Sequence, residues 1–455
     1  MEKIKYYSTN HKSGLFTFQE ALLKGLAPDK GLFLPDRIPE ISIEEIEELT
    51  GLSYAEIAYR ISHKFLQLDI PDLELEKIVR DAYNYDVPLE HVYERKYVMR
   101  LDQGPTASFK DFAARMMGRL MQYYLSLKQG ELLILTATSG DTGSAIANAF
   151  YGLENIKVLV LFPRHEVTAR QRKQMTTLGK NVTILALDAK FDDCQSLVKE
   201  AFSDQELDYL NLSSANSINI GRLLPQIIYY FYSYSRLIEK TGEQAIFSVP
   251  SGNFGDMMGG MLAFRMGLPV RRFIIATNEN DEFPIFVNTG KYDKIVPSLN
   301  CISSAMNVGH PSNLARLVDL YNGIMDENGS VTKTPDFEKM RKEIMAISIT
   351  DEQTRNTIYE AYKKYKLLLE PHGAVGWSGL LKYLESNPED DNEKQLCISL
   401  ETAHPAKFPE QIREILGVDP KLPPSLEGLE EKKENFDMIK NDYSSFKAYL
   451  KQKYK

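Results

Sequence analysis

The sequence LLILTATSGDTGSAIANAF occupies residues 132–150 and predicts a strand, a turn and a helix in succession. Its first six residues, LLILTA, form a continuous apolar run, which is typical of a strand buried on both faces of a parallel sheet. TSGDTG follows at residues 138–143, and a helical stretch at residues 144–150. Glycines let a backbone turn sharply and approach a ligand, while N–H groups at a helix start attract anions. This stretch therefore predicts an α/β fold with an anion-binding turn.

A second stretch has the same arrangement. The apolar run at residues 245–249 passes through Pro250 into SGNFG at residues 251–255, and a helical stretch follows at residues 256–266. Two such turns predict two bound anionic groups. Neither turn matches GxGxxG or GxxxxGK[ST], so NAD and ATP are poorly supported as ligands. Each turn taken alone also fits a plain tight turn of an α/β fold.

Lys110 begins a predicted helix directly after a Gly-Pro turn, in LDQGPTASFKDF at residues 101–112. The positive end of a helix dipole disfavours a charged lysine and biases it toward the neutral amine. A neutral lysine amine is a nucleophile that forms Schiff bases with carbonyl compounds, including pyridoxal phosphate. The alternative is that Asp111 compensates the charge and the Lys110 side chain extends to water.

Further apolar runs alternate with amphipathic segments, at residues 157–162, 182–187, 273–277 and 395–400. This alternation predicts βα units around mainly parallel sheets, with ligands bound at the carboxyl ends of the strands. We expect a mainly helical unit over residues 1–95, α/β domains over 96–235 and 236–425, and a helical tail over 426–455. The site should lie in a cleft between the two α/β domains. Residues 387–394 should form a surface loop, and the tail from Glu427 an exposed helix of mixed charge.

Composition excludes several classes of protein. The net charge of −9 over 455 residues, from 54 basic and 63 acidic side chains, provides no basic field for nucleic acid. No apolar run is long enough for a membrane span, and the amino end lacks a signal peptide core. Cys194, Cys301 and Cys397 are odd in number and far apart, which fits a reducing cytoplasm without disulfides. No spacing between histidines indicates a metal site. His372 and His404 lie in motif-like loops, where each either orients a ligand or satisfies a buried turn.

Several motifs together resemble threonine synthase, in the form shared by fungi and many bacteria. They are GPTASFKDFAARMM, TATSGDTGSA, SANSIN, VPSGNFGD and TAHPAKF, with FQEALLKGLAPDKGLFLP at residues 18–35, and the resemblance continues to about Gly417. It implies the tryptophan-synthase-β-like, fold type II class of pyridoxal phosphate enzymes. That class has two parallel-sheet α/β domains, here with a mainly helical N-terminal domain. The implied reaction converts O-phospho-L-homoserine and water to L-threonine and phosphate, and we expect a monomer or homodimer.

The resemblance also implies roles for individual residues. Lys110 would be the catalytic lysine and the point of cofactor attachment. Thr402 would lie at the pyridine nitrogen, where a hydroxyl does not enforce a protonated ring. Asp141 would approach the phenolic oxygen or contact the loop backbone. The cofactor phosphate would bind to the SGNFG turn, which consists of Ser251, Gly252, Asn253, Phe254 and Gly255.

Two further segments are implied to bind the substrate. Its carboxylate would bind to the TSGDTG turn, through Thr138, Ser139, Gly140 and Thr142. Its phosphate would bind to the SANSIN segment, through Ser214, Asn216, Ser217 and Asn219, with Arg115 and Lys173 as charge partners. The alternative is that SANSIN is a polar turn that caps the helix beginning near Arg222.

Other functions stay open at this point. A phospho-lyase or dehydratase that releases 2-oxobutyrate would use the same residues. A non-catalytic protein that binds pyridoxal phosphate or a phospho-metabolite would not need the amine of Lys110. A nucleotide-binding α/β protein is disfavoured by the absent fingerprints.

Overall fold

The structure, a computed structural model, describes residues 2–128, 130–138, 140–392 and 394–454. The N-terminal part contains two short antiparallel strands, β1 (Tyr6–Ser8) and β2 (Phe33–Pro35), and four helices. These are α1 (Phe18–Lys24), α2 (Ile43–Glu47), α3 (Tyr54–Leu66) and α4 (Asp72–Ala82). The first three each begin with a reciprocal capping box, which satisfies N–H groups that a helix start leaves without partners. The mainly helical character predicted for this part is confirmed.

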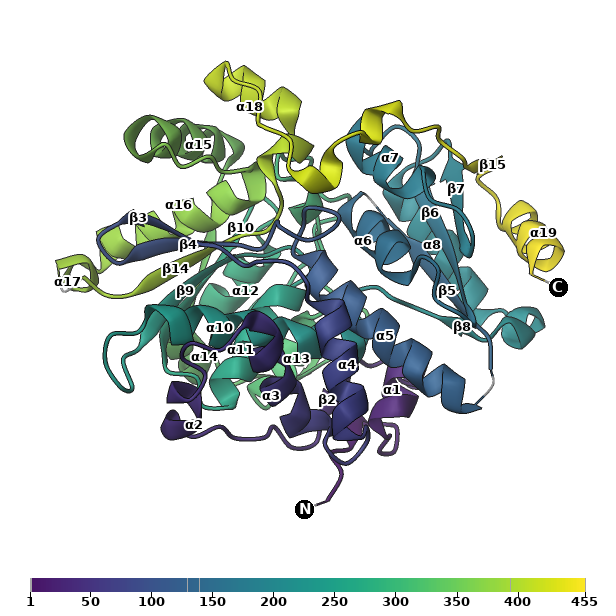
Figure 1. The fold of residues 1–455 in the computed structure, drawn as a ribbon, viewed down its shortest axis with the longest axis horizontal. Helices are drawn as coiled ribbons and strands as arrows, with labels where there is room; N and C mark the ends of the chain where they lie inside the picture. Colours follow the sequence, from purple (N-terminus) through teal and green to yellow (C-terminus); the bar gives the residue numbers. More distant parts are fainter. Residues whose placement is uncertain (1, 129, 139, 393, 455) are drawn as a thin grey trace.

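The first of two large sheets has five parallel strands in the order β15-β7-β6-β5-β8 (Figure 1). Side chains of β5 alternate between its faces: Ile134 joins the core beneath α5 and α6, and Leu135 joins a cluster with α8 and α19. Helices therefore cover both faces, as the continuous apolar run predicted. The strands are β5 (Leu132–Ala137), β6 (Ile156–Pro163), β7 (Val182–Leu187), β8 (Leu212–Ser213) and β15 (Asp437–Ile439). The helices are α5 (Lys110–Lys128), α6 (Asp141–Phe150), α7 (Ala169–Thr176), α8 (Phe191–Ser203) and α19 (Tyr443–Lys453).

The second sheet has six strands in the order β13-β10-β9-β14-β4-β3, and only the β3–β4 pair is antiparallel. Its strands are β3 (Leu89–Tyr93), β4 (Lys96–Arg100), β9 (Ala245–Pro250), β10 (Val270–Thr277), β13 (Ile344–Ser348) and β14 (Cys397–Glu401). One face packs against α15 (Asp351–Tyr365) and α16 (Pro371–Ser386). The other packs against α10 (Ile228–Leu237) and α11 (Gly255–Arg265). The prediction of two mainly parallel sheets is confirmed.

Shorter elements connect these layers. The helices are α9 (Ile220–Leu223), α12 (Glu282–Thr289), α13 (Leu314–Leu320), α14 (Phe337–Glu343), α17 (Pro388–Asn392) and α18 (Pro409–Leu416). Strands β11 (Ile324–Met325) and β12 (Val331–Lys333) form a small antiparallel pair. The 3₁₀ turns are η1 (Gln205–Leu210), η2 (Leu224–Ile227), η3 (Ser304–Met306), η4 (Pro405–Lys407), η5 (Pro424–Leu426) and η6 (Leu429–Glu431).

Two local predictions are wrong. The loop expected at residues 387–394 contains the short helix α17, whose first turn is acidic and therefore complements the helix dipole. The tail expected as one exposed helix from Glu427 is helical only in α19 and in the short turn η6, while its strand β15 pairs with β7. Phe446 and Leu450 of α19 are fully buried on the first sheet. The tail is thus part of the folded body.

The strand order also bears on the expected domains. Strands β3 and β4 pair on either side of the boundary expected at residue 95, and β4 joins strands from the 236–425 segment. Strand β15, from beyond residue 425, joins the sheet of the 96–235 segment. The division into domains stays a prediction.

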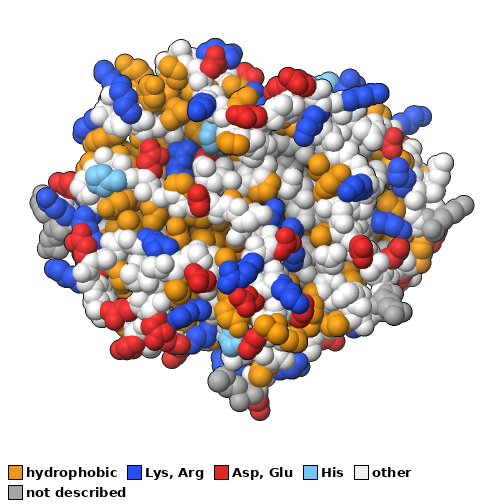
Figure 2. Space-filling model, in the orientation of Figure 1, with side chains coloured by type: hydrophobic (Ala, Val, Ile, Leu, Met, Phe, Trp, Pro, Cys, Tyr) orange, Lys and Arg blue, Asp and Glu red, His pale blue; other side chains and the backbone are white. Residues whose placement is uncertain are grey.

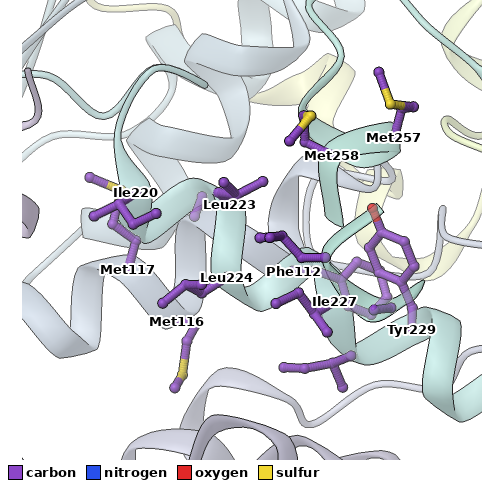
Figure 3. Packing of buried hydrophobic residues seen from close by; sticks show 14 of the residues in the cluster. Phe112, Met116, Met117, Ile220, Leu223, Leu224, Ile227, Tyr229, Met257 and Met258 are labelled. Carbon is purple, nitrogen blue, oxygen red and sulfur yellow. The ribbon is translucent and has the colours of Figure 1, made fainter. Parts of the chain in front are cut away.

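The two sheets and the N-terminal helices share one apolar core. Figure 3 shows how α5, α9, η2 and α11 meet within it, through Phe112, Met116, Met117, Ile220, Leu223, Leu224, Ile227, Met257 and Met258. Helix α5 begins at Lys110 and α11 begins at Gly255, so this packing fixes the two helix starts relative to each other.

The surface is of mixed charge. Figure 2 shows acidic and basic side chains interspersed on one face, with no extended patch of one sign. None of the helices in the described ranges has the length and apolar character that crossing a membrane requires. The three cysteines are buried free thiols.

One buried carboxyl group makes stability depend on pH. Glu282 in α12 is 2% exposed, its Oε2 lacks a hydrogen-bond partner among the described residues, and burial raises its pKa to about 8. An unfolded glutamate has a pKa of about 4.3, so the folded state binds more protons between these values and stability falls as pH rises through that window. We expect Glu282→Gln to raise the free energy of unfolding over wild type by about 4 kcal/mol at pH 8, but only by about 1 kcal/mol at pH 5. Urea denaturation at both pH values tests this, and an equal effect at the two would contradict it.

Candidate active site

Lys110 is positioned by the chain segment that follows β14. Ser108 and Ala403 form an isolated antiparallel bridge, Phe109 N–H donates to the Thr402 carbonyl at 2.9 Å, and His404 N–H donates to the Ala107 carbonyl at 3.0 Å. The SFKDF and ETAHPAKF motifs therefore lie side by side. This pairing brings Lys110 next to the carboxyl end of a central strand of the second sheet.

Asp111 does not compensate the charge of Lys110. Its carboxylate accepts hydrogen bonds from the Thr106 N–H at 2.8 Å and the Thr106 hydroxyl at 2.7 Å, which closes the turn before α5. The Lys110 side chain is only 14% exposed, so it does not extend to water. Burial is the largest cause that lowers the pKa of Lys110, and the nearby cations Lys407 and Arg222 lower it further. The alternative assigned to Asp111 is therefore wrong.

Asp141, at the start of α6, lies between two lysines. Its Oδ1 is 2.7 Å from Lys407 Nζ and its Oδ2 is 3.7 Å from Lys110 Nζ. Gln171 donates to Oδ1 from Nε2 at 2.9 Å. Burial alone would raise the pKa of Asp141, but the two lysines outweigh it and hold this pKa well below its usual range. Lys407 belongs to the TAHPAKF motif, but the sequence did not predict its role, because only the fold brings it to Asp141.

The TSGDTG turn presents an uncapped helix start. The Thr138 hydroxyl accepts hydrogen bonds from the N–H groups of Gly140 at 3.0 Å and Gly143 at 2.8 Å, which fixes the turn. The N–H groups of Asp141 and Thr142 donate to no acceptor among the described residues. They are available to an anion such as a substrate carboxylate. Ser139 lies outside the described residues.

The SGNFG turn presents a second uncapped helix start, between β9 and α11. Phe254 adopts a left-handed conformation with φ of 61° and makes no side-chain cap. Within the described chain, the N–H groups of residues 252–255 find no acceptor, and the amide nitrogen of Asn253 likewise has no partner. Ser251 N–H donates to the Ala276 carbonyl at 2.9 Å, so it anchors the turn to β10. Four successive free N–H groups suit a phosphate.

Thr402 lies at the carboxyl end of β14, and its hydroxyl is 3.4 Å from Glu370 Oε1. Glu370 also caps α16, because its carboxylate accepts hydrogen bonds from the N–H groups of His372 at 2.7 Å and Gly373 at 2.9 Å. The Nε2 of His372 accepts from the Ala305 N–H at 3.0 Å, so Nδ1 carries the proton that faces Glu370. The Nδ1 of His404 accepts from the Ala406 N–H at 3.1 Å. Both histidines therefore satisfy buried turns.

The SANSIN segment combines capping with free polar groups. Asn219 is fully buried: its side chain accepts from the Gly221 N–H and donates to the carbonyls of Leu22 and Ser214, so it caps α9 as the alternative proposed. The Asn216 Oδ1 accepts from the Thr136 hydroxyl at 3.4 Å, and the Ser214 hydroxyl accepts from the Asn216 N–H at 3.2 Å. The hydroxyl of Ser217 and the amide nitrogen of Asn216 have no partner within the described part of the chain. Asn313 donates to the carbonyls of both Ser217 and Asn253, so SANSIN lies beside SGNFG.

The two expected charge partners lie elsewhere. Arg115 donates to the carbonyls of Asp81 and Ala82, both at 2.7 Å, at the end of α4. Lys173 donates to the carbonyl of Glu430 near the C-terminus. Contrary to the prediction, both cations are therefore held by other segments, because each projects from the face of its helix that packs there.

Arg222 of α9 is a further buried cation near Lys110 that the sequence did not single out. It is 3% exposed, and its Nη1 donates to the Ala215 carbonyl at 2.8 Å. Its buried Nε lacks a partner among the described residues, and burial lowers its pKa to about 10. A buried guanidinium with an unused donor, close enough to Lys110 to lower its pKa, is suited to an anionic ligand.

A buried amine, two uncapped helix starts and a hydroxyl at the end of a central strand suit pyridoxal phosphate, whose aldehyde and phosphate need an amine and an anion cradle. The fold and the site thus define a pyridoxal-phosphate-dependent enzyme, and the family description "Pyridoxal-phosphate dependent enzyme" matches residues 87–399. "Threonine synthase N terminus" matches residues 5–83, and "Threonine synthase, C-terminal" matches residues 373–450. The chain belongs to the threonine synthase family.

Individual relatives agree with this assignment. The chain is 37% identical to a threonine synthase from Haemophilus influenzae over 98% of this chain and 99% of the relative. It is 40% identical to one from Escherichia coli, over 93% and 94% of the two chains. A pyridoxal-phosphate-bound threonine synthase structure from Brucella melitensis superposes with a TM-score of 0.91 at 36% identity, covering 99% of each chain. The yeast threonine synthase structure gives 0.90 at 30% identity over 98% of each. The predicted fold class, family and cofactor are confirmed.

Proposed function

We propose that this chain converts O-phospho-L-homoserine and water to L-threonine and phosphate. The observation that carries the proposal is the pair of uncapped helix starts beside Lys110, a buried lysine with a lowered pKa. When bound, pyridoxal phosphate supplies an electron sink for charge that develops at the substrate's α-carbon. In the overall reaction the Cγ–O bond to phosphate breaks, and the oxygen of water bonds to Cβ.

The roles that we propose follow from the hydrogen-bond donors that have no partner among the described residues and from the amine of Lys110. The N–H groups of residues 252–255 and the Asn253 amide bind the cofactor phosphate, and the start of α6 binds the substrate carboxylate. The neutral amine of Lys110 accepts a proton from the α-carbon as general base. Thr402 faces the ring nitrogen. Ser217, Asn216 and Arg222 bind the phosphate of the substrate.

Product analysis tests the proposal. Purified protein loaded with pyridoxal phosphate and given O-phospho-L-homoserine should release threonine and phosphate in equal amounts. Release of phosphate with 2-oxobutyrate in place of threonine would assign the lyase reaction instead. Release of neither would contradict an enzymatic role on this substrate.

A substitution distinguishes Arg222 from Arg115 as the ligand of the substrate phosphate. We expect Arg222→Lys to raise KM for O-phospho-L-homoserine about tenfold, because lysine keeps the charge but loses the planar fork of donors. Arg115→Lys should leave KM unchanged, since Arg115 binds the end of α4. Initial rates over a range of substrate concentrations measure both. A wild-type KM for Arg222→Lys, or a raised KM for Arg115→Lys alone, would contradict the assignment.

Oligomeric state and cellular compartment also belong to the proposal. A monomer or homodimer is proposed. A reducing compartment such as the cytoplasm is supported by three buried free thiols.

A further inference from the structure

Lys407 ties three motifs together inside the protein. It is fully buried in η4, and its Nζ lies 2.7 Å from Asp141 Oδ1 and donates to the Thr106 carbonyl at 2.8 Å. Thr106 belongs to the turn before Lys110, and Asp141 follows Gly140 of the TSGDTG turn. Lys407, which belongs to the TAHPAKF motif, therefore holds in place both the turn before Lys110 and the TSGDTG turn.

Charge balance explains what this arrangement does to Lys110. In this buried cluster, Asp141 is the carboxylate that contacts both lysine amines, and one carboxylate cannot neutralise two ammonium groups. The buried carboxylate of Asp111 also interacts electrostatically with Lys407 and Arg222, but its oxygens accept hydrogen bonds from Thr106. Burying the surplus charge is costly, so the cluster favours losing one proton. Lys407 is held by two short contacts, whereas Lys110 is 1.0 Å farther from the carboxylate, at 3.7 Å against 2.7 Å. The proton is therefore lost from Lys110.

Charged side chains from four neighbouring elements act on the Lys110 amine. Asp141 of α6 and Asp256 of α11 attract a proton to its amine, while Lys407 of η4 and Arg222 of α9 repel one. Burial raises the pKa of Asp256 to about 6, so over most of the pH range of the test its carboxylate is ionised and attracts a proton to Lys110 equally in every variant.

We propose that Lys407 is a positioning residue that neutralises Asp141 and thereby leaves Lys110 as a free amine, ready to condense with the cofactor aldehyde. The inference rests on the proposed function only in assigning that condensation to Lys110. In it, the amine nitrogen bonds to the aldehyde carbon and the carbonyl oxygen leaves as water.

The test measures the pH dependence of this condensation in protein freed of cofactor, from the change in visible absorbance on adding pyridoxal phosphate between pH 6 and 10. In Lys407→Met, Asp141 pairs with Lys110 alone and stabilises its charged form. We therefore expect the midpoint of the pH profile of the condensation rate to rise by about one pH unit, which lowers the rate near pH 7.5 about tenfold. Asp141→Asn should move the midpoint downward, since the attraction of the Asp141 carboxylate is lost while the repulsion of Lys407 and Arg222 remains. The double variant should lie between the two.

Lys96→Met is the matched control. Lys96 is also fully buried and its Nζ is also 2.7 Å from a carboxylate oxygen, that of Asp391, but it lies at the opposite end of β4 and β14 from the site. This control should lose stability without moving the midpoint. A wild-type midpoint in Lys407→Met would overturn the inference, as would the same shift in Lys96→Met.

Two further outcomes are separable. Should Lys407→Met not fold, the Asp141→Asn variant decides: a downward shift supports the inference, and no shift or an upward one overturns it. Absence of condensation in the wild-type protein would instead contradict the proposed function, because Lys110 would then not bind the cofactor.

Discussion

Lys110→Ala is expected to abolish covalent attachment of pyridoxal phosphate and to lower kcat by about a thousandfold or more, the range typical of losing a general base that is also the covalent anchor. The nearby Lys407 should not substitute for it, because it is bound to Asp141 and to the Thr106 carbonyl. The cofactor should still bind without a covalent bond, through the N–H groups of the SGNFG turn. Borohydride reduction followed by peptide mapping measures the attachment.

Lys128→Ala is the matched control for this variant, because Lys128 is an exposed lysine at the other end of the same helix. It should retain wild-type attachment and turnover. A reduced adduct that persists in Lys110→Ala on another lysine, with turnover intact, would contradict the role of Lys110.

Gly140→Ala is expected to lower kcat/KM about a hundredfold, for two reasons that act together. Gly140 has φ of +138°, a conformation that costs a residue with a Cβ about 1–3 kcal/mol. A Cβ there would also lie 2.7–2.8 Å from side-chain atoms of Gln171, too close for van der Waals contact. Because Gln171 donates to Asp141, its displacement also disturbs the carboxylate beside Lys110.

Gly417→Ala is the control that introduces backbone strain without a clash against a neighbouring side chain. Gly417 follows α18 with φ of +70°, and a Cβ at this position would meet no described atom within 4 Å. The variant should therefore lose some stability but no activity. Steady-state kinetics and thermal unfolding of both variants measure the two effects. Equal kcat/KM in Gly140→Ala and Gly417→Ala would contradict the role assigned to the TSGDTG turn.

The sequence predicted those features that depend on local pattern. The run at residues 132–137 is a strand with the predicted bounds, because a strand buried on both faces is apolar throughout. Strand β15 was missed, because Asp437 and Met438 are exposed and its partner β7 lies far earlier in the chain. The acidic segment that forms α17 lacks the apolar periodicity by which a helix is recognised.

The residues of the candidate site also divide into those that a local sequence pattern indicates and those that only the fold brings together. Lys110 and the two glycine turns carry local signals, whereas Lys407, Glu370 and Arg222 act through contacts that only the folded chain creates. The expectation that Arg115 binds the substrate phosphate rested on motif membership, which does not show which way a helical side chain points. Packing of α5 against α4 directs it to the Ala82 carbonyl.

The most direct test of the proposed reaction follows the oxygen of water. In H₂¹⁸O, the loaded wild-type protein acting on O-phospho-L-homoserine should yield threonine with one ¹⁸O on its Cβ hydroxyl and phosphate with none, as measured by mass spectrometry. This result requires cleavage of the Cγ–O bond and addition of water at Cβ. Labelled phosphate with no labelled threonine would show hydrolysis at phosphorus and would contradict the account.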